Sequence, residues 1–289
     1  MLAIRRSARS AWFSLLLMPL LLATATAAEQ PSKSVAPPAA AAGAPRSAAA
    51  DAATYARCMQ LTRQDPHAAQ SLAQTWLAHG GAHPAGHCAA VALIALGKYQ
   101  EGATRLQQLA RAMTKAPAAL RADVLDQAAQ AWLLAGDPAR AYAAAGEALS
   151  LQPADPDLLI DRAEAAASAG YYDRAIGDLD RVLKAHPERV DALIYRASAY
   201  RALDRLDPAR ADIDQALVQA PDSPAALLER GNIRRLEGNA AGARRDWEAV
   251  GHVAPGSPEA MAALANLEHL TKDGGAVAPA RPIAKAPPP

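Results

Sequence analysis

The sequence predicts an all-α solenoid, because it repeats every thirty-four residues and each repeat has the pattern of two amphipathic helices. Proline marks the period, at Pro153, Pro187, Pro221 and Pro255. Apolar and small residues spaced three and four apart lie on both sides of a turn residue, which is Gly136, Gly170, Asp204 or Gly238. This spacing places each set on one face of a helix. Residues 122–257 therefore form four clear repeats.

The repeats also share where their small residues fall. Each first half has a leucine followed four positions later by a small residue: Leu125 with Ala129, Leu159 with Ala163, Leu193 with Ala197, and Leu227 with Gly231. This arrangement, with the closing proline, resembles the tetratricopeptide repeat (TPR) family. The resemblance implies a right-handed superhelical TPR solenoid that acts as a binding scaffold. It does not define a ligand, because a fold does not fix a function.

The pattern continues more weakly on both sides of the clear repeats. Residues 51–121 predict two degenerate TPR-like helix pairs, over 51–63 with 66–79 and over 86–96 with 99–113. About five extra residues around Lys115 predict either a longer helix or an added loop. Pro258 at a first helical turn predicts a capping helix over 258–270. The expected total is about six helix pairs plus this C-terminal capping helix.

The ends of the chain have a different composition. Residues 1–27 have the layout of a signal peptide, with three arginines, a short apolar run and an alanine-rich end. An uncleaved membrane anchor is the alternative, but Pro19 interrupts the run, which is shorter than the roughly 20 apolar residues that span a bilayer. Residues 28–50 and 271–289 predict a disordered Ala/Pro-rich tether and a disordered tail. We expect a periplasmic protein with no membrane insertion after cleavage.

Composition and motifs argue against several functions. Hydrophobic residues make up 51% of the chain but aromatic residues only 4%, as expected for alanine-rich helices that pack closely. The formal net charge of +1, without a basic run, gives no reason to expect a nucleic-acid partner. No phosphate loop, nucleophile elbow or zinc-protease motif is present in the sequence, so we expect a non-catalytic protein without a cofactor.

Arginine and aspartate recur together in the clear repeats. Arg162, Arg196 and Arg230 share one position in the first helix, and Asp178, Asp212 and Asp246 lie sixteen residues later. The arginines predict either a ladder that binds a ligand or ion pairs that join helices. The repetition of the acid with the base favours the ion pairs.

The two cysteines, Cys58 and Cys88, fall on first helices that adjoin in a TPR stack. In an oxidising compartment this placement predicts a disulfide, worth on the order of 3 kcal/mol. The competing hypothesis is a zinc or copper site formed by His79, His83 and His87 beside Cys88. Nearby glycines predict a loop there, and a disulfide would remove the thiolate, so we assign no metal.

The TPR resemblance also assigns the residues that face the concave groove. They are Asp123, Asp126 and Gln130; Asp157, Ile160 and Glu164; Asp191, Ile194, Ser198 and Arg201; and Leu228, Asn232 and Arg235. The first two repeats are acidic here and the last two are basic, with Ile160, Ile194 and Leu228 as an apolar floor. This predicts a protein or extended peptide partner with the complementary charge pattern. One alternative is that the charges only keep the surface soluble. Another is that the chain is a structural subunit of a cell-envelope assembly.

Overall fold

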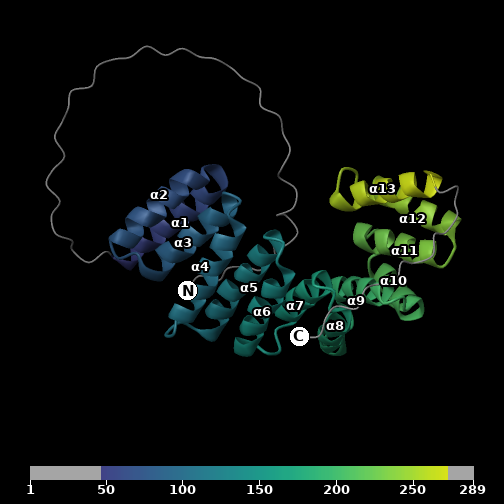
Figure 1. The fold of residues 1–289 in the computed structure, drawn as a ribbon, viewed down its shortest axis with the longest axis horizontal. Coiled ribbons are helices and arrows are strands. Elements are labelled where there is room, and N and C mark those ends of the chain that lie inside the picture. Colours follow the sequence, from purple (N-terminus) through teal and green to yellow (C-terminus); the bar gives the residue numbers. More distant parts are fainter. Residues whose placement is uncertain (1–46, 273–289) are drawn as a thin grey trace, which may run out of the picture. The chain divides into compact units, whose positions relative to one another are not determined.

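A computed structural model describes residues 47–272 of the chain, which form thirteen helices and no strand within that range (Figure 1). The helices are α1 (Ala48–Gln64), α2 (Pro66–Ala78), α3 (Ala82–Ala95), α4 (Tyr99–Ala112), α5 (Ala118–Leu134), α6 (Pro138–Leu151), α7 (Pro156–Ser168), α8 (Tyr172–Ala185), α9 (Val190–Ala202), α10 (Leu206–Gln219), α11 (Pro224–Leu236), α12 (Ala240–Val253) and α13 (Pro258–Lys272).

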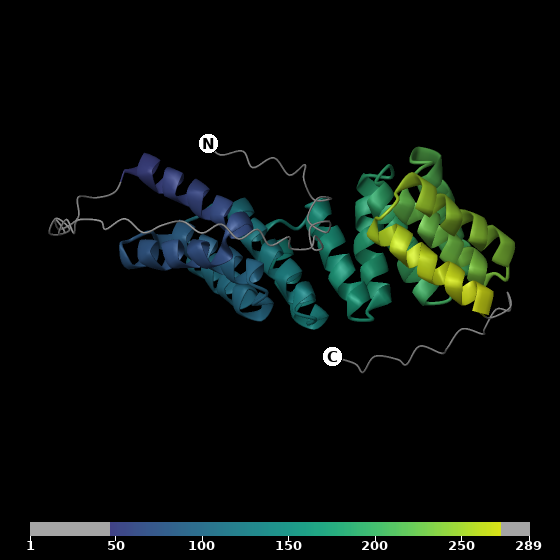
Figure 2. The ribbon, with the colours of Figure 1, turned by 90° about the horizontal axis from the view of Figure 1, so that it is seen from above.

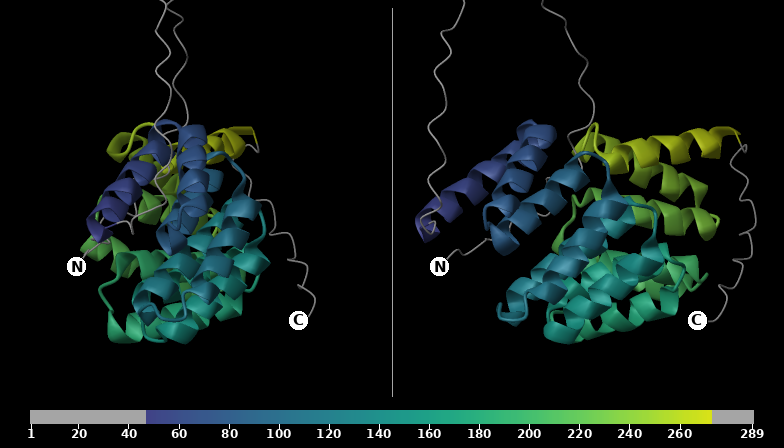
Figure 3. Two further views of the ribbon diagram at one scale, coloured as in Figure 1. Left: turned by 90° about the vertical axis from the view of Figure 1, so that its left-hand side faces the viewer. Right: turned by 60° about the vertical axis from the view of Figure 1, so that its left-hand side comes forward.

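Successive helices lie side by side in chain order, as Figures 2 and 3 show from other directions. Each helix from α1 to α12 contacts the next, which gives six pairs followed by the single helix α13. The first helices of consecutive pairs also touch: α5 contacts α7, α7 contacts α9, α9 contacts α11, and α11 contacts α13. The expected all-α solenoid of six helix pairs and a final helix is therefore confirmed.

The turn inside each clear pair depends on a residue with positive φ. Gly136, Gly170 and Gly238 have φ of 73°, 78° and 81°, and Asp204 has φ of 58° at the equivalent position. The next residue donates its amide back across the last turn of the first helix, as from Asp137 to the Trp132 carbonyl at 2.9 Å. This is the hydrogen bond that ends a helix in a Schellman motif. Aspartate tolerates the left-handed region better than most residues, so the pattern survives at position 204.

The recurring prolines end the second helices. α6, α8, α10 and α12 each stop two residues before their proline, and the intervening cap residues, such as Gln152 with φ −135° and ψ 75°, have left the helical region. The ring of a proline excludes the helical conformation from the residue before it. Pro153, Pro187, Pro221 and Pro255 thus set the length of each repeat.

Small residues let the two helices of a pair approach closely. Ala175, Ala209 and Ala243 are fully buried where the second helix meets the first. At Gly231 a Cβ would lie only 2.6 Å from Cδ1 of Trp247. The core is therefore a continuous seam of alanine and leucine between helices.

Several boundaries differ from those expected from the sequence. α1 begins at Ala48, inside the predicted tether, because the Ser47 side chain accepts the amide of Ala50 and caps the helix. α3 begins at Ala82 rather than at residue 86, despite its glycines. The extra residues after Met113 lengthen α5, which begins at Ala118. α13 extends two residues into the predicted tail, to Lys272.

The predicted signal peptide, nearly all of the predicted tether and the tail beyond Lys272 lie outside the described residues. Among the helices of residues 47–272, none has both the length and the hydropathy required to cross a bilayer.

Candidate functional site

The groove residues expected from the sequence lie on α5, α7, α9 and α11, which are neighbours in space. We call the side of the molecule carrying these residues the first-helix face. Not all of them reach its surface. Asp126 is only 5% exposed and Ile160 only 6%, while Ile194 and Leu228 are half-buried and pack against the core. The expectation of Ile160 as an open apolar floor is therefore wrong, and Asp126 lies mostly inside the array.

Acidic groups concentrate where α7 meets α9. The pKa of Glu164 is raised mainly by burial and, to a smaller extent, by the negative charge of Asp161. Burial also raises the pKa of Tyr195, with further contributions from Glu164, Asp161 and Asp191. A negative charge on either side chain is thus unfavourable in the surrounding field.

One arginine compensates part of this acidity. Arg189, immediately before α9, donates from Nη2 to Asp157 at 3.1 Å and from Nη2 and Nε to Asp191 at 2.6 and 2.9 Å. The pKa of Arg189 is raised, mainly by its hydrogen bonds to Asp191. Burial alone would raise the pKa of Asp191, but the hydrogen bonds from Arg189 help to lower it. Sequence analysis missed Arg189 because it lies in the loop before the helix.

The carboxyl-terminal half of the first-helix face is polar rather than basic. Arg201 donates from Nε to Glu229 at 2.5 Å, and Asn232 donates to the other carboxylate oxygen of Glu229 at 3.2 Å. Asn266 of α13 donates to Asn232 at 2.9 Å and extends this chain of hydrogen bonds across α9, α11 and α13. Arg201, which the sequence places among the basic groove residues, is therefore paired with the buried Glu229.

The other expected residues of this face are more accessible. Gln130 is exposed, and Asp123, Ser198 and Arg235 are half-buried. Ser198 Oγ lies 3.4 Å from Nη2 of Arg201. Arg235 has no ion-pair partner within residues 47–272 and is the remaining basic group at this end.

The recurring arginines pair with the recurring aspartates. Arg162 donates from Nε to Asp178 at 2.7 Å, Arg196 to Asp212 at 2.8 Å, and Arg230 to Asp246 at 3.1 Å. Each pair uses a second nitrogen on the second carboxylate oxygen, which gives the bidentate geometry that arginine favours. The aspartates are 3 to 5% exposed. Ion pairing between helices is confirmed, and a ligand-binding arginine ladder is wrong.

Cys58 of α1 and Cys88 of α3 form the expected disulfide, with their Cα atoms 6.2 Å apart. Beside the disulfide, the Tyr55 hydroxyl hydrogen bonds to Nδ1 of His87 at 2.9 Å. Nε2 of His87 hydrogen bonds to the side-chain oxygen of Gln127, also at 2.9 Å. Burial lowers the pKa of His87, although the bond to Gln127 opposes this shift. The neutral ring therefore joins α1, α3 and α5.

This arrangement overturns the alternative of a metal site. The Cys88 thiolate is absent because its sulfur is in the disulfide, and both ring nitrogens of His87 are hydrogen bonded. His83 lies on the exposed side of α3 rather than in a loop, and His79 hydrogen bonds to the Thr75 carbonyl at 2.6 Å. No three His, Cys, Asp or Glu side chains of residues 47–272 are grouped to hold a metal ion.

A further feature that sequence analysis missed is an aromatic cluster along the turns of the third and fourth pairs. Arg140 stacks over the Trp132 ring at 4.7 Å, and Arg174 lies over the rings of Tyr142 and Tyr171 at 5.7 and 5.0 Å. A cavity of about 380 Å³ lies between Trp132, Arg140 and Tyr171. These stacked side chains stiffen the turns on which the pairs depend.

The repeated pairs and their contacts can be compared with known proteins. Residues 160–224 and 202–258 match the tetratricopeptide repeat family model. A comparison with curated protein sequences gave no match. The chain is similar to a thermophilic TPR protein of Thermus thermophilus, at 19% identity and a TM-score of 0.52, with 65% of this chain and 100% of that chain covered.

Two further solved structures are similar. A TPR protein from Parabacteroides merdae matches at 19% identity and a TM-score of 0.53, with 67% of this chain and 80% of that one covered. YrrB, described as a TPR protein with an unusual peptide-binding site, matches at 18% identity and a TM-score of 0.50, with 60% and 88% covered. At these identities the likeness concerns the fold. Residues 160–258 thus carry tetratricopeptide repeats, and the described helices share the fold of TPR proteins.

Proposed function

We propose that this chain is an exported, non-catalytic binding module of the periplasm that holds a basic, extended segment of a partner protein along its first-helix face. The observation that carries the proposal is the acidic cluster of Asp161 and Glu164 on α7 next to Tyr195 on α9, where burial and mutual repulsion raise the pKa of Glu164. A lysine or arginine placed there would relieve that repulsion. The similar protein YrrB has an unusual peptide-binding site, which agrees with this use of the fold.

The polar network at the other end of the face extends the proposal. Asn232 and Asn266 are joined by a hydrogen bond and are half-buried, with Arg235 nearby on α11. Amides can both donate to and accept from the backbone of an extended peptide. The partner segment should therefore be basic where it meets α7 and α9, and polar or acidic where it meets α11. An acidic chaperone tail, which would need basic groups at the position of Glu164, is disfavoured.

The binding proposal can be tested with two fluorescent peptides of equal length, one of alternating Lys and Ser and one of alternating Glu and Ser. Fluorescence anisotropy should show tighter binding of the Lys/Ser peptide, with weaker binding at higher salt. In the double variant Asp161→Asn, Glu164→Gln, binding should weaken about tenfold or more. These substitutions keep the side-chain shape and avoid the buried Asp126.

A matched control changes two exposed carboxylates on second helices, with Asp214→Asn and Glu248→Gln. This variant alters the net charge of the chain by the same amount and should bind the Lys/Ser peptide as the unmodified chain does. Equal loss in both double variants would mean that general charge attraction, and not the first-helix face, holds the peptide. Equal binding of the two peptides by the unmodified chain would also refute the proposal.

The proposed compartment has separate support. The Cys58–Cys88 disulfide suits an oxidising environment, and the arginines and apolar run near the start of the sequence suit an export signal. Fractionation of the producing cells should place the protein in the periplasm, and its intact mass should correspond to a chain that begins at Ala28 or Glu29. A membrane-bound chain that retains Met1 would contradict export with cleavage, while leaving the peptide test unaffected.

A further inference from the structure

The first helix, α1, is attached to the rest of the array by few apolar contacts. Of its seventeen residues, only Cys58 and Thr62 are buried. Cys58 belongs to a small core cluster with Ala73 of α2 and with Cys88 and Ala89 of α3, separate from the larger clusters of the later pairs. Burial of apolar surface is the main force that holds helices together. The position of α1 therefore depends strongly on the disulfide and on polar contacts.

One histidine makes the polar contacts. His87 precedes Cys88 on α3, and its half-buried ring is hydrogen bonded to the first helices of the pairs on either side. The Tyr55 hydroxyl of α1 lies 2.9 Å from Nδ1, and Oε1 of Gln127 on α5 lies 2.9 Å from Nε2. The rings of Tyr55 and His87 are also in contact, with their centroids 5.9 Å apart. We call these three side chains the His87 bridge.

The partners of the ring determine which nitrogen carries its hydrogen. The side-chain oxygen of Gln127 can only accept, so Nε2 of His87 donates to it. Nδ1 has no hydrogen in the neutral ring and accepts from the Tyr55 hydroxyl. Burial raises the pKa of Tyr55, so this hydroxyl keeps its hydrogen near neutral pH. The bridge is thus complete when the imidazole is neutral.

A proton taken from solvent would disrupt the bridge. It would bind Nδ1 and turn the acceptor of the Tyr55 hydrogen bond into a second donor. It would also place a positive charge between packed helices, which is why burial lowers the pKa of His87.

No charged group on the surrounding helices contributes to this shift, whose causes are burial and the opposing hydrogen bond to Gln127. The charged or titratable groups on those helices are Asp51, Tyr55, Arg57 and Arg63 of α1, His67 of α2, Tyr99, Glu101, Arg105 and Arg111 of α4, and Arg121, Asp123 and Asp126 of α5.

The lowered pKa gives the direction of the pH dependence. When α1 is released, water reaches His87, and the ring takes up a proton near its ordinary pKa of 6.5. In the closed bridge the ring takes up a proton only at lower pH. The released form therefore binds more protons than the closed form below pH 6.5, and the closed form loses stability as the pH falls through this range. Well above pH 6.5 both forms are neutral, and the full stability of the bridge is present.

We infer that the His87 bridge is a proton-operated latch, which holds α1 against α3 and α5 when the ring is neutral and releases α1 when Nδ1 takes up a proton. The bond between Cys58 and Cys88 keeps the released helix attached, so α1 can open and close without leaving the array. The latch involves the first three first helices and not the acidic cluster of α7 and α9. It therefore goes beyond the proposed binding function and does not depend on it.

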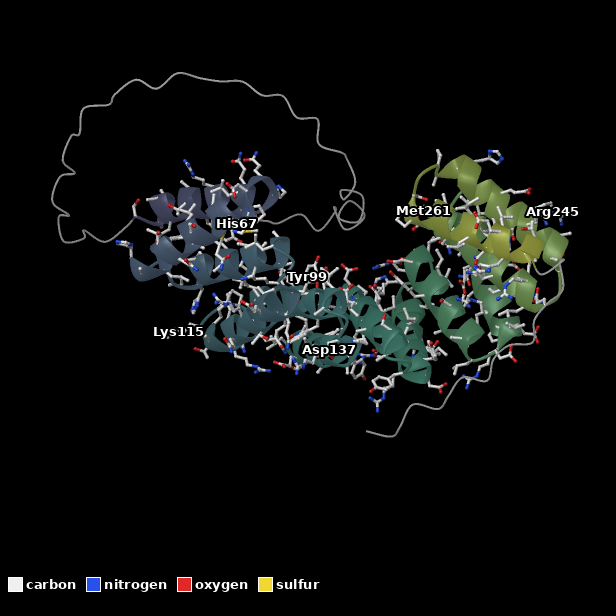
Figure 4. All side chains as sticks on the ribbon, turned by 45° about the horizontal axis from the view of Figure 1, so that its top comes forward. His67, Tyr99, Lys115, Asp137, Arg245 and Met261 are labelled. Atoms are coloured by element: carbon white, nitrogen blue, oxygen red, sulfur yellow. A yellow bond between two sulfur atoms is a disulfide. The ribbon has the colours of Figure 1, made fainter. Side chains whose placement is uncertain are left out.

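Hydrogen exchange of the full chain with its disulfide intact, measured at about pH 7.5 and about pH 5.5 and corrected for the intrinsic exchange rate, tests the latch. The corrected exchange of α1 amides should be about threefold or more faster at the lower pH. His87→Gln introduces a side chain that cannot take up a proton, so it should remove this difference. His67→Gln, at an exposed histidine of the neighbouring α2 (Figure 4), is the matched control and should leave the difference unchanged.

Gln127→Glu tests the same bridge without changing the histidine. Its carboxylate would accept from the charged ring and favour the protonated form, so α1 should be at least as well protected at the lower pH as at the higher one. Circular dichroism checks that each variant remains helical, and Gln127→Glu decides the matter if His87→Gln does not fold.

Equal corrected exchange of α1 at the two pH values in the unmodified chain would overturn the inference. A pH difference that persists unchanged in His87→Gln or in Gln127→Glu would do the same. All of these measurements are made without a peptide, so failure of the latch and failure of the proposed function are distinguishable.

Discussion

Trp247 occupies the space that a side chain at position 231 would need. A Cβ on Gly231 would lie 2.6 Å from Cδ1 of its ring and closer still to Nε1, and the indole is 1% exposed. Elsewhere the same repeat position holds alanine, since Leu179 and Ile213 take the place of the tryptophan in other pairs. The size of one residue on the first helix is thus matched to one residue on the second.

Gly231→Ala should therefore destabilise the protein, although alanine favours helices. The tryptophan must move to admit the methyl group, and overpacking of this kind costs about 1 to 3 kcal/mol. Gly177→Ala in α8 is the matched control, because a Cβ there meets no other atom within 4 Å. It should stabilise the helix by about 0.5 to 1 kcal/mol. Urea denaturation measures both, and equal effects of the two substitutions would refute the packing argument.

Glu164 should make stability depend on pH in an unusual direction for an acid. Burial and Asp161 raise its pKa in the folded chain above the ordinary 4.5, so the folded state binds the proton more tightly than the unfolded state. The contribution of this group to stability is therefore greatest below pH 4.5 and is lost as the pH rises through the folded-state pKa. Glu164→Gln should raise the Tm at about pH 7 and change it little at about pH 4.

The control for this experiment is Glu248→Gln, which neutralises an exposed glutamate on α12. It should shift the Tm little at either pH. If Glu164→Gln lowered the Tm near neutral pH, the glutamate would be a stabilising member of an ion pair, and the acidic cluster would not be poised for a cationic ligand.

The pairs from α7 to α12 each carry the same bidentate ion pair between their two helices. The aspartate is almost fully buried, whereas the arginine keeps part of its surface in water, as with 22% exposure for the Arg162 side chain. A buried carboxylate without its partner is costly, while loss of both charges together is often tolerated. The pair therefore specifies which helix faces meet more than it adds to stability.

Arg162→Met should destabilise the fold by about 2 to 3 kcal/mol, because Asp178 is left without its bidentate partner. The double variant Arg162→Met, Asp178→Leu should recover most of that loss. Chemical denaturation of the two single variants and the double variant gives the coupling between them. Arg111→Met breaks the exposed pair with Glu147 and should cost at most about 1 kcal/mol. A double variant as unstable as Arg162→Met would contradict this account.

Contacts between neighbouring helices hold the whole array together, with α1 also joined to α3 by the disulfide. Arrays of this kind lose structure from their ends. Reduction should therefore loosen α1 and α2 while leaving α9 to α13 protected, with a loss on the order of 3 kcal/mol confined to the amino-terminal end. Hydrogen exchange measured by mass spectrometry in the oxidised and reduced chain checks this. Uniform loss of protection along the chain would mean that the array unfolds as one unit.

The fold could be predicted from the sequence because each repeat encodes its own helices, turn and closing proline. The Arg162–Asp178 pair was predictable because it recurs in three successive repeats. The disulfide was predictable because Cys58 and Cys88 fall on first helices that adjoin in the stack. The roles of Arg189 and Glu229 were not, because both act across the boundary between repeats, where side-chain direction decides the partner. Burial of Asp126 and Ile160 likewise depends on how closely α5 and α7 pack, which a shared period does not determine.

The bond between Cys58 and Cys88 also has a mechanical consequence. A force applied to the two ends of the chain would peel helices from the array one after another. Cys58 and Cys88 are thirty positions apart in the sequence, and the chain between them cannot extend under that force while the bond is intact, which withholds about 100 Å of extended chain. The opposite end has no such crosslink among the described residues. Under load, the protein should therefore unfold first from α13, before α1 and α3 are disturbed.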